Sequence, residues 1–253
     1  MTADLPKEPN AAMLADAVSD TVNRTDAAVA PQDAASLLIY EPSGEDILIL
    51  MGQRGAATQF MPNRYVFPGG RVDIGDRTIA APTHGLAPSE TAKLRLRMEP
   101  PVEDDRAHAL AIAAVRETFE EAGIVFGART PGNNAGASES TMPPVPIWSQ
   151  FAAHADTPDL SALTYFARAI TPPGQKRRYD TRFFCAPRSA VLTETGVTDG
   201  ELTNLAWYPL AELEALNLAP ITKAILGEFK HAQLSEALHA GCPDVPFYFQ
   251  QDG

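Results

Sequence analysis

Two apolar runs in the first quarter of the chain predict a β-hairpin. Residues 35–40 (ASLLIY) and 47–51 (ILILM) have strand composition, and the intervening EPSGED segment consists of turn-forming residues. Further apolar runs predict strands at residues 163–170, 182–186 and 202–208. These strands show neither a regular βαβ period nor an internal repeat, so we expect an α+β domain with a mixed sheet.

The strongest helical pattern covers residues 103–122. No Pro or Gly interrupts it, acidic residues fill its first turn, and Gly123 stands where a left-handed C-terminal cap belongs. Weaker patterns predict shorter helices at residues 11–22, 89–97, 147–155, 210–216 and 220–238. After a short apolar strand, residues 68–70 (PGG) should form a turn that permits unusual backbone angles and lets the main chain approach a ligand.

Changes in composition predict one domain with two tails. Residues 1–32 have little apolar bulk to bury, which favours a flexible N-terminal arm. Residues 33–240 form the domain, a Pro-rich and basic stretch at residues 77–102 is an excursion from it, and residues 241–253 are a C-terminal tail. The Gly-, Ser- and Asn-rich residues 127–146 are expected to form a loop.

Composition and charge indicate which classes of binding partner are unfavourable for this protein. The 253 residues are 45% hydrophobic, enough for a substantial core, and 20 basic against 32 acidic residues give a net charge of −12. That charge argues against nucleic acid or an anionic membrane as the main partner. No apolar run reaches the roughly 18 residues needed to span a bilayer, and the first thirty residues lack secretory-signal features, so we expect a cytoplasmic location. Cys185 and Cys242 are expected to be reduced thiols.

Three acids near the end of the predicted helix point to a metal. Glu117, Glu120 and Glu121 fall on one side of a helix whose opposite side carries Ile112 and Val115. Like charges at this spacing cost roughly 0.2 to 0.5 kcal/mol per pair, and the helix dipole also disfavours acids at this end. A hard divalent cation would relieve both penalties, because Mg²⁺ is held by a few carboxylates together with phosphate and water oxygens. The alternative is an ordinary solvated face, which is common on acidic proteins.

The same helix carries a recognisable motif. Residues 70–76 (GRVDIGD) and 116–124 (RETFEEAGI) resemble the Nudix box, whose pattern is G-x5-E-x7-R-E-U-x-E-E-x-G-U with U a bulky apolar residue. Thr118 departs from the pattern at the first U, and Asp76 stands where the pattern has Glu. The gap from Asp76 to Arg116 is 39 residues instead of seven, so about 32 residues are inserted within the box. The resemblance implies a Nudix-type α/β/α sandwich with a mixed sheet.

One branch of the family shares this interrupted box. Segments of this chain look like those of peroxisomal coenzyme A diphosphatases and their bacterial relatives, namely residues 53–55, 60–62, 66–70, 171–172, 177–184 and 207–209. The resemblance covers about residues 33–229 and implies Mg²⁺-dependent hydrolysis of a diphosphate linkage, with coenzyme A or acyl-CoA as the substrate. The last four residues (QQDG) are no peroxisomal address, which favours a bacterial cytoplasmic relative.

The resemblance also assigns roles to residues. It implies that Glu117, Glu120 and Glu121 are catalytic and bind the metal, which is Mg²⁺ with Mn²⁺ as the alternative, together with backbone at Gly70. Arg116 would orient a glutamate through a fork-like ion pair, a geometry for which Arg is better suited than Lys. Which carboxylate activates water is left open, and the loop carboxylates Glu194 and Glu201 are additional candidates that compete with an ordinary acidic-loop reading.

Basic side chains could bind phosphate groups away from the reacting bond. The candidates are Arg54, Arg64, Arg178 and Arg182, with Lys176 and Arg177 beside them. We rank Arg182 above Lys176, although each of these residues could equally be a solvated surface group.

The sequence leaves two alternative functions open. The first is hydrolysis of ADP-ribose, NADH or a nucleotide sugar by the same chemistry. The second is a Nudix module that senses a nucleotide without cleaving it, for which the interrupted box gives some reason. The expected partner in each case is a small molecule with a diphosphate, not nucleic acid or a membrane, and a homodimer is left open.

Overall fold

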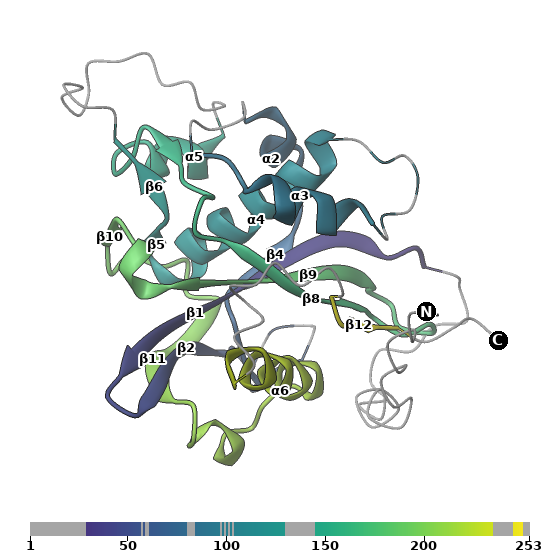
Figure 1. The fold of residues 1–253 in the computed structure, drawn as a ribbon, viewed down its shortest axis with the longest axis vertical. Helices are drawn as coiled ribbons and strands as arrows, with labels where there is room; N and C mark the ends of the chain where they lie inside the picture. Colours follow the sequence, from purple (N-terminus) through teal and green to yellow (C-terminus); the bar gives the residue numbers. More distant parts are fainter. Residues whose placement is uncertain are drawn as a thin grey trace, which may run out of the picture.

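A mixed eight-stranded sheet separates two helical layers (Figure 1). The computed structural model describes residues 29–56, 58, 61–79, 84–96, 98, 100, 102, 104–129, 145–234 and 245–249. The main path of the sheet runs β11-β2-β1-β9-β8-β12, with β3 paired to β2 and β4 paired to β1. Its strands are β1 (Gln32–Ser43), β2 (Asp46–Arg54), β3 (Tyr65–Val66), β4 (Gly69–Arg71), β8 (Thr164–Ile170), β9 (Tyr179–Pro187), β11 (Leu202–Pro209) and β12 (Phe247–Tyr248).

Helices cover both faces of this sheet. One layer contains α2 (Ile74–Thr78), α3 (Pro88–Arg95), α4 (Asp104–Ala122) and α5 (Pro146–Phe151), and the other contains α6 (Pro220–Leu234). The short elements are β5 (Ile124–Val125) paired with β10 (Thr193–Glu194), β6 (Gly127–Ala128) paired with β7 (Thr157–Pro158), η2 (Arg188–Ala190) and η3 (Leu213–Ala215). The expected α/β/α sandwich of the α+β class with a mixed sheet is confirmed.

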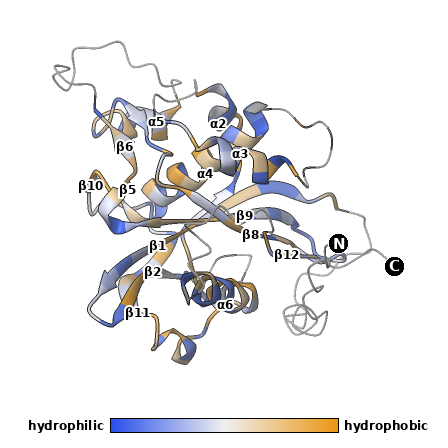
Figure 2. Ribbon diagram, viewed as in Figure 1, coloured by the Kyte–Doolittle hydropathy of each residue, from blue (hydrophilic) through white to orange (hydrophobic). Residues whose placement is uncertain are grey.

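Two hydrophobic clusters hold the layers together. On the α4 side, Leu110, Ile112 and Val115 are fully buried in one cluster, and on the α6 side Ile225 and Phe229 are fully buried in the other. Figure 2 shows the hydrophobic segments of α4 lying next to the sheet. Burial of apolar area at roughly 25 cal/mol per Å² on both faces fixes the sheet between the helices. The position of the acidic end of α4 is therefore set by the core.

Local sequence patterns located most of the elements. The predicted hairpin forms between β1 and β2, with Ser43 paired to Asp46, and Gly123 caps α4 with a φ of 65°. The helical pattern at residues 210–216 was wrong in extent, because only the three residues of η3 are helical and they form a 3-10 turn. The expected helix at residues 11–22 lies outside the described residues.

Gly69 and Gly70 are needed for space, not for unusual backbone angles. Both lie in β4, antiparallel to β1, and neither has a positive φ, so the predicted turn geometry was wrong. A Cβ on Gly69 would come within 2.6 Å of the Ala35 carbonyl oxygen, and a Cβ on Gly70 would overlap the Glu117 carboxylate. Glycine at position 69 lets β4 pass this close to the backbone of β1, and glycine at position 70 leaves the Glu117 carboxylate in its place.

Helix α3 lies in the stretch between the two halves of the box. Glu90 accepts the Tyr165 backbone N–H at 2.7 Å, and Lys93 donates to the Tyr165 carbonyl at 3.1 Å. Glu90 and Lys93 also pair with each other at 2.6 Å. Because Tyr165 already faces β9 on its other side, α3 occupies the open edge of β8 at this position. Helix α3 of the excursion thus packs on the domain.

Candidate active site

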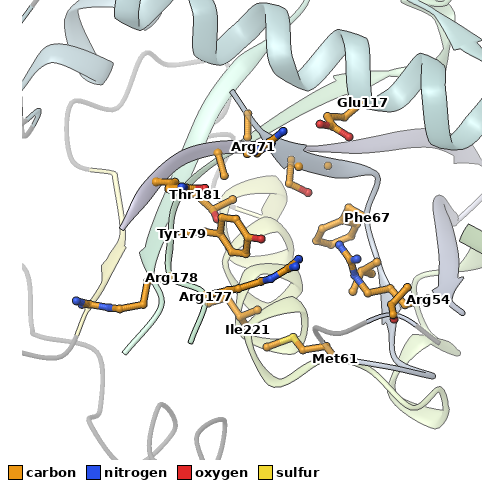
Figure 3. Close-up of a pocket in the computed structure, with 18 of the residues that line it drawn as sticks. Arg54, Met61, Phe67, Arg71, Glu117, Arg177, Arg178, Tyr179, Thr181 and Ile221 are labelled. Carbon is orange, nitrogen blue, oxygen red and sulfur yellow. The ribbon is translucent and has the colours of Figure 1, made fainter. Parts of the chain in front are cut away.

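A cavity of about 840 Å³ opens beside the carboxylate end of α4 (Figure 3). Its walls come from β1, β4 and β9, from the loop that follows β2, and from the start of α6. The lining includes Glu117, Glu121, Gly69, Gly70, Arg54, Glu201, Phe67, Tyr179, Thr181, Phe183 and Ile221. The predicted helix carboxylates and the predicted glycine segment therefore meet in one cavity.

Glu121 is a buried carboxylate held by backbone. Only 2% of the residue is exposed, and its Oε2 accepts the Gly69 N–H at 2.8 Å. Burial and the neighbouring Glu117 charge raise the pKa of Glu121 well above its ordinary value, although the hydrogen bond from Gly69 opposes this shift. The ionised Glu121 carboxylate is therefore not fully stabilised by the groups of the protein around it.

Glu117 is the second carboxylate of the cavity. Its side chain is 14% exposed and lies 2.9 Å from Nη1 of Arg116. Burial raises the pKa of Glu117 to about 7, despite the opposing charge of Arg116. Figure 3 shows the carboxylate directed from α4 toward the cavity. An acidic face in open solvent, the alternative considered from the sequence, is therefore wrong for this helix.

Arg116 links the two separated halves of the box. Its Nε and Nη2 donate to Asp76 at 2.8 and 3.0 Å, and its Nη1 donates to Glu120 at 2.7 Å. The expected fork-like pair is thus made with Asp76, and only one donor reaches Glu120. Burial alone would lower the pKa of Arg116, but the Asp76 hydrogen bond and the charges of Glu117, Asp76 and Glu120 raise it above its ordinary value.

Asp76, which stands where the box pattern has Glu, is the buried partner of Arg116. It is fully buried on α2, and its Oδ2 also accepts the Asp73 N–H at 2.8 Å in a capping box. Because Asp76 carries both the helix cap and the Arg116 pair, it fixes α2 against α4. The sequence could have indicated this pair, because Asp76 is an acidic residue at a box position. The gap of 39 residues between Asp76 and Arg116 made the pair hard to predict.

The arrangement suits a divalent cation that takes some of its oxygen ligands from the protein and the rest from the substrate and water. Glu117 and Glu121 offer oxygen donors beside the close backbone of Gly70, and both buried carboxylates lack full charge compensation. Within the described ranges, no three His, Cys, Asp or Glu side chains group closely enough to enclose a metal unaided. Glu120 is instead occupied by Arg116, at the edge of the group. Mg²⁺ commonly completes its shell with phosphate and water oxygens, so the open set fits.

The structure divides the predicted phosphate-binding arginines into two groups. Arg54 and Arg178 line the cavity, and Arg54 pairs with Glu201 at 2.7 Å. Arg64 does not line it, and donates to the Asn217 side chain at 2.7 Å. Glu201 also faces the cavity, whereas Glu194 pairs with Arg188 away from it. Glu201 is therefore the loop carboxylate that reaches the site.

The assignment of Arg182 to substrate binding is corrected. Its side chain is 1% exposed and donates to Asp33 at 3.1 Å and to the Asp180 carbonyl at 2.8 Å. Alternate residues of a strand face opposite sides, and Thr181 and Phe183 take the cavity side of β9. Arg182 therefore lies on the other face, in a buried ion cluster, and does not reach the cavity that Lys176 lines.

The metal-free protein should lose stability as the pH rises from about 5 to 8. Glu117 ionises near 4.5 when unfolded and near 7 when folded, so the folded state holds the additional proton between these values. Stability is full below the unfolded pKa and falls as the pH passes the folded pKa, by roughly 2–3 kcal/mol. Urea unfolding across this pH range measures the slope, and Glu117→Gln should reduce it, leaving the part that comes from the raised pKa of Glu121. A stability that stays level or rises in the wild type contradicts this prediction.

Comparisons with known proteins agree with the fold and the motif. The family model described as the NUDT19 Nudix domain matches residues 10–217. The crystal structure of a NUDIX hydrolase from Alicyclobacillus acidocaldarius aligns with a TM-score of 0.53 at 27% identity, over 85% of this chain and 94% of that one. The sandwich, the box and these matches define the chain as a Nudix domain. More specifically, it belongs to the family of the NUDT19 Nudix domain.

Curated relatives carry a specific name. The human acyl-coenzyme A diphosphatase NUDT19 is 33% identical over 181 residues, which cover 56% of this chain and 48% of the relative. The protein of the same name from Gallus gallus is 28% identical over 206 residues, covering 64% and 54%. The chain thus spans about half the length of the curated relatives it matches. None of the helices in the described part of the chain has the length and hydrophobicity to cross a bilayer.

Proposed function

We propose that this protein hydrolyses the diphosphate linkage of coenzyme A or acyl-CoA in the presence of Mg²⁺, giving 3′,5′-ADP and phosphopantetheine or its acyl form. The observation that carries the proposal is the meeting of Glu117 and Glu121 with several basic side chains in one cavity. The names of the relatives support the choice of substrate. A cytoplasmic location remains a prediction from the sequence, and a homodimer is left open.

The carboxylate end of the cavity would carry the metal. Glu117 and Glu121 would bind it, with the Gly70 backbone as a further oxygen donor and Glu120 held nearby by Arg116. A bound Mg²⁺ supplies neutralisation of the charge that develops on the phosphate oxygens. The Gly69 N–H orients Glu121, and the hydrogen bond from Arg116 to the carbonyl oxygen of Arg71 keeps α4 and its carboxylates in register with β4.

The reaction itself is a displacement at phosphorus. A water oxygen forms a bond to one phosphorus of the diphosphate while the bridging P–O bond breaks, and the other phosphate departs with the bridging oxygen. A base must accept the proton of the attacking water. Glu201 is suited to this role because it lies in the cavity, where its pairing with Arg54 at 2.7 Å fixes the position of its carboxylate.

Replacement of Glu201 by Gln should lower kcat by roughly 10²-fold or more, because loss of a general base typically costs this much. The matched control is Glu194→Gln, which removes an arginine-paired glutamate of the same loop region outside the cavity. Steady-state hydrolysis of coenzyme A measures the effect. Equal rates for both variants would exclude Glu201 as the base.

A product-resolved screen tests the substrate assignment. Coenzyme A, acyl-CoA, ADP-ribose and NADH are incubated with Mg²⁺ or Mn²⁺, and the products are separated by chromatography. Release of 3′,5′-ADP from coenzyme A is the expected result. Cleavage of ADP-ribose or NADH alone would move the protein to the alternative substrate class, and binding without cleavage of any compound would make it a sensing module.

A further inference from the structure

The cavity is more basic than the protein that contains it. The whole chain has a net charge of −12, yet the described lining carries five basic and three acidic side chains. The basic ones are Arg54, Arg71, Lys176, Arg177 and Arg178, and the acidic ones are Glu117, Glu121 and Glu201. A locally positive wall on an acidic protein indicates an anionic ligand.

Three of these cations already have protein partners. Arg54 pairs with Glu201 at 2.7 Å, and Arg71 pairs with Asp73 at 3.1 Å. Arg178 donates to the carbonyl oxygens of Thr171 and Val29, each at 2.9 Å, and so ties β9 to the chain ahead of β1. These contacts explain why the three residues are present without invoking a ligand.

Lys176 and Arg177 have no such explanation. Both are exposed in the turn between β8 and β9, both line the cavity, and neither makes an ion pair or side-chain hydrogen bond with a residue that the structure describes. Figure 3 shows Arg177 extending into the cavity beside Tyr179 and toward Phe67 and Arg54, whereas Arg178 points away. An exposed guanidinium that has no acidic partner among the described residues is available to pair with an anionic group of a ligand.

We propose that Arg177, assisted by Lys176, binds a phosphomonoester of the substrate that is separate from the diphosphate being cleaved. This inference rests on the proposed function for the identity of the reaction. The metal and the helix carboxylates would engage the diphosphate, and a third phosphate would require additional positive charge, which the planar guanidinium supplies in bidentate form. Coenzyme A has such a group on its ribose, whereas dephospho-coenzyme A, ADP-ribose and NADH lack it. Arg177 is therefore a specificity-determining residue.

Substrate pairs that differ by this phosphate provide the test. The wild type should hydrolyse coenzyme A with a kcat/KM roughly 10- to 100-fold above that for dephospho-coenzyme A. Arg177→Gln should bring this ratio close to one, because kcat/KM for coenzyme A falls while kcat/KM for dephospho-coenzyme A changes little. Lys176→Gln should reduce the ratio less. Arg129→Gln is the matched control, because Arg129 is exposed and does not line the cavity.

A binding measurement separates this inference from the reaction. Calorimetric titration of the wild type should show tighter binding of 3′,5′-ADP than of 5′-AMP, and Arg177→Gln should abolish the difference. Equal affinity for the two nucleotides in the wild type, or an equal loss for both in the variant, overturns the subsite. Failure to cleave any diphosphate while the 3′,5′-ADP preference persists would reject the proposed function and keep the subsite.

Discussion

Glu121→Gln should lower Mg²⁺-dependent hydrolysis by roughly 10²- to 10³-fold while the protein stays folded, because it removes a charge that would face the metal and the reacting phosphate. The amide oxygen can still accept the Gly69 N–H, so the 2.8 Å contact and the local backbone should survive. Burial raises the pKa of Glu121 well above its ordinary value, so an uncharged side chain relieves a cost of folding. The metal-free variant should be at least as stable as the wild type.

Two measurements check this combination. Turnover is followed as a function of Mg²⁺, and the melting temperature is recorded with and without the ion. The variant should lose both the activity and most of the Mg²⁺-dependent rise in melting temperature. Glu212→Gln, an exposed glutamate outside the cavity, is the matched control. Unchanged rates in both Glu117→Gln and Glu121→Gln would remove the metal-carboxylate proposal.

Asp76→Asn should reduce the free energy of unfolding by roughly 2–4 kcal/mol, because it takes one partner from a buried ion pair. Asp76 is fully buried, and its carboxylate receives two donors of Arg116. Without this charge, Arg116 keeps Glu117 and Glu120 as its acidic partners, and α2 is held less firmly against α4. Activity should fall as well, since the position of the carboxylates depends on this contact.

Urea unfolding and coenzyme A hydrolysis measure the two effects of this substitution. Asp76→Glu keeps the charge and is expected to lose less stability than Asp76→Asn, although an additional methylene in a packed core costs roughly 1–3 kcal/mol. A stability of Asp76→Asn equal to that of the wild type would show that the pair does not hold the two halves of the box together.

The elements that were predicted well depend on neighbours within one or two turns or strands. The β1–β2 hairpin, the extent of α4 and the Gly123 cap follow from short-range periodicity and turn chemistry. The pattern at residues 210–216 failed because its apolar residues Leu210 and Leu213 are buried by tertiary packing without needing a helix. The spacing of apolar residues indicates which side chains are buried, but burial alone does not determine whether the backbone is helical.

The placement of the site residues shows the same division. The sequence alone determined that three acids lie at the end of a helix and that a Gly-Gly segment follows a short apolar strand, because both features are local. Only the tertiary structure decided that Asp76 meets Arg116 across 40 positions, that Arg182 is buried with Asp33, and that Arg177 enters the cavity. A strand sends alternate residues to opposite faces, and the sheet that assigns those faces is assembled from segments distant in the chain. Charge and spacing therefore identified the chemistry, and packing selected which side chains reach it.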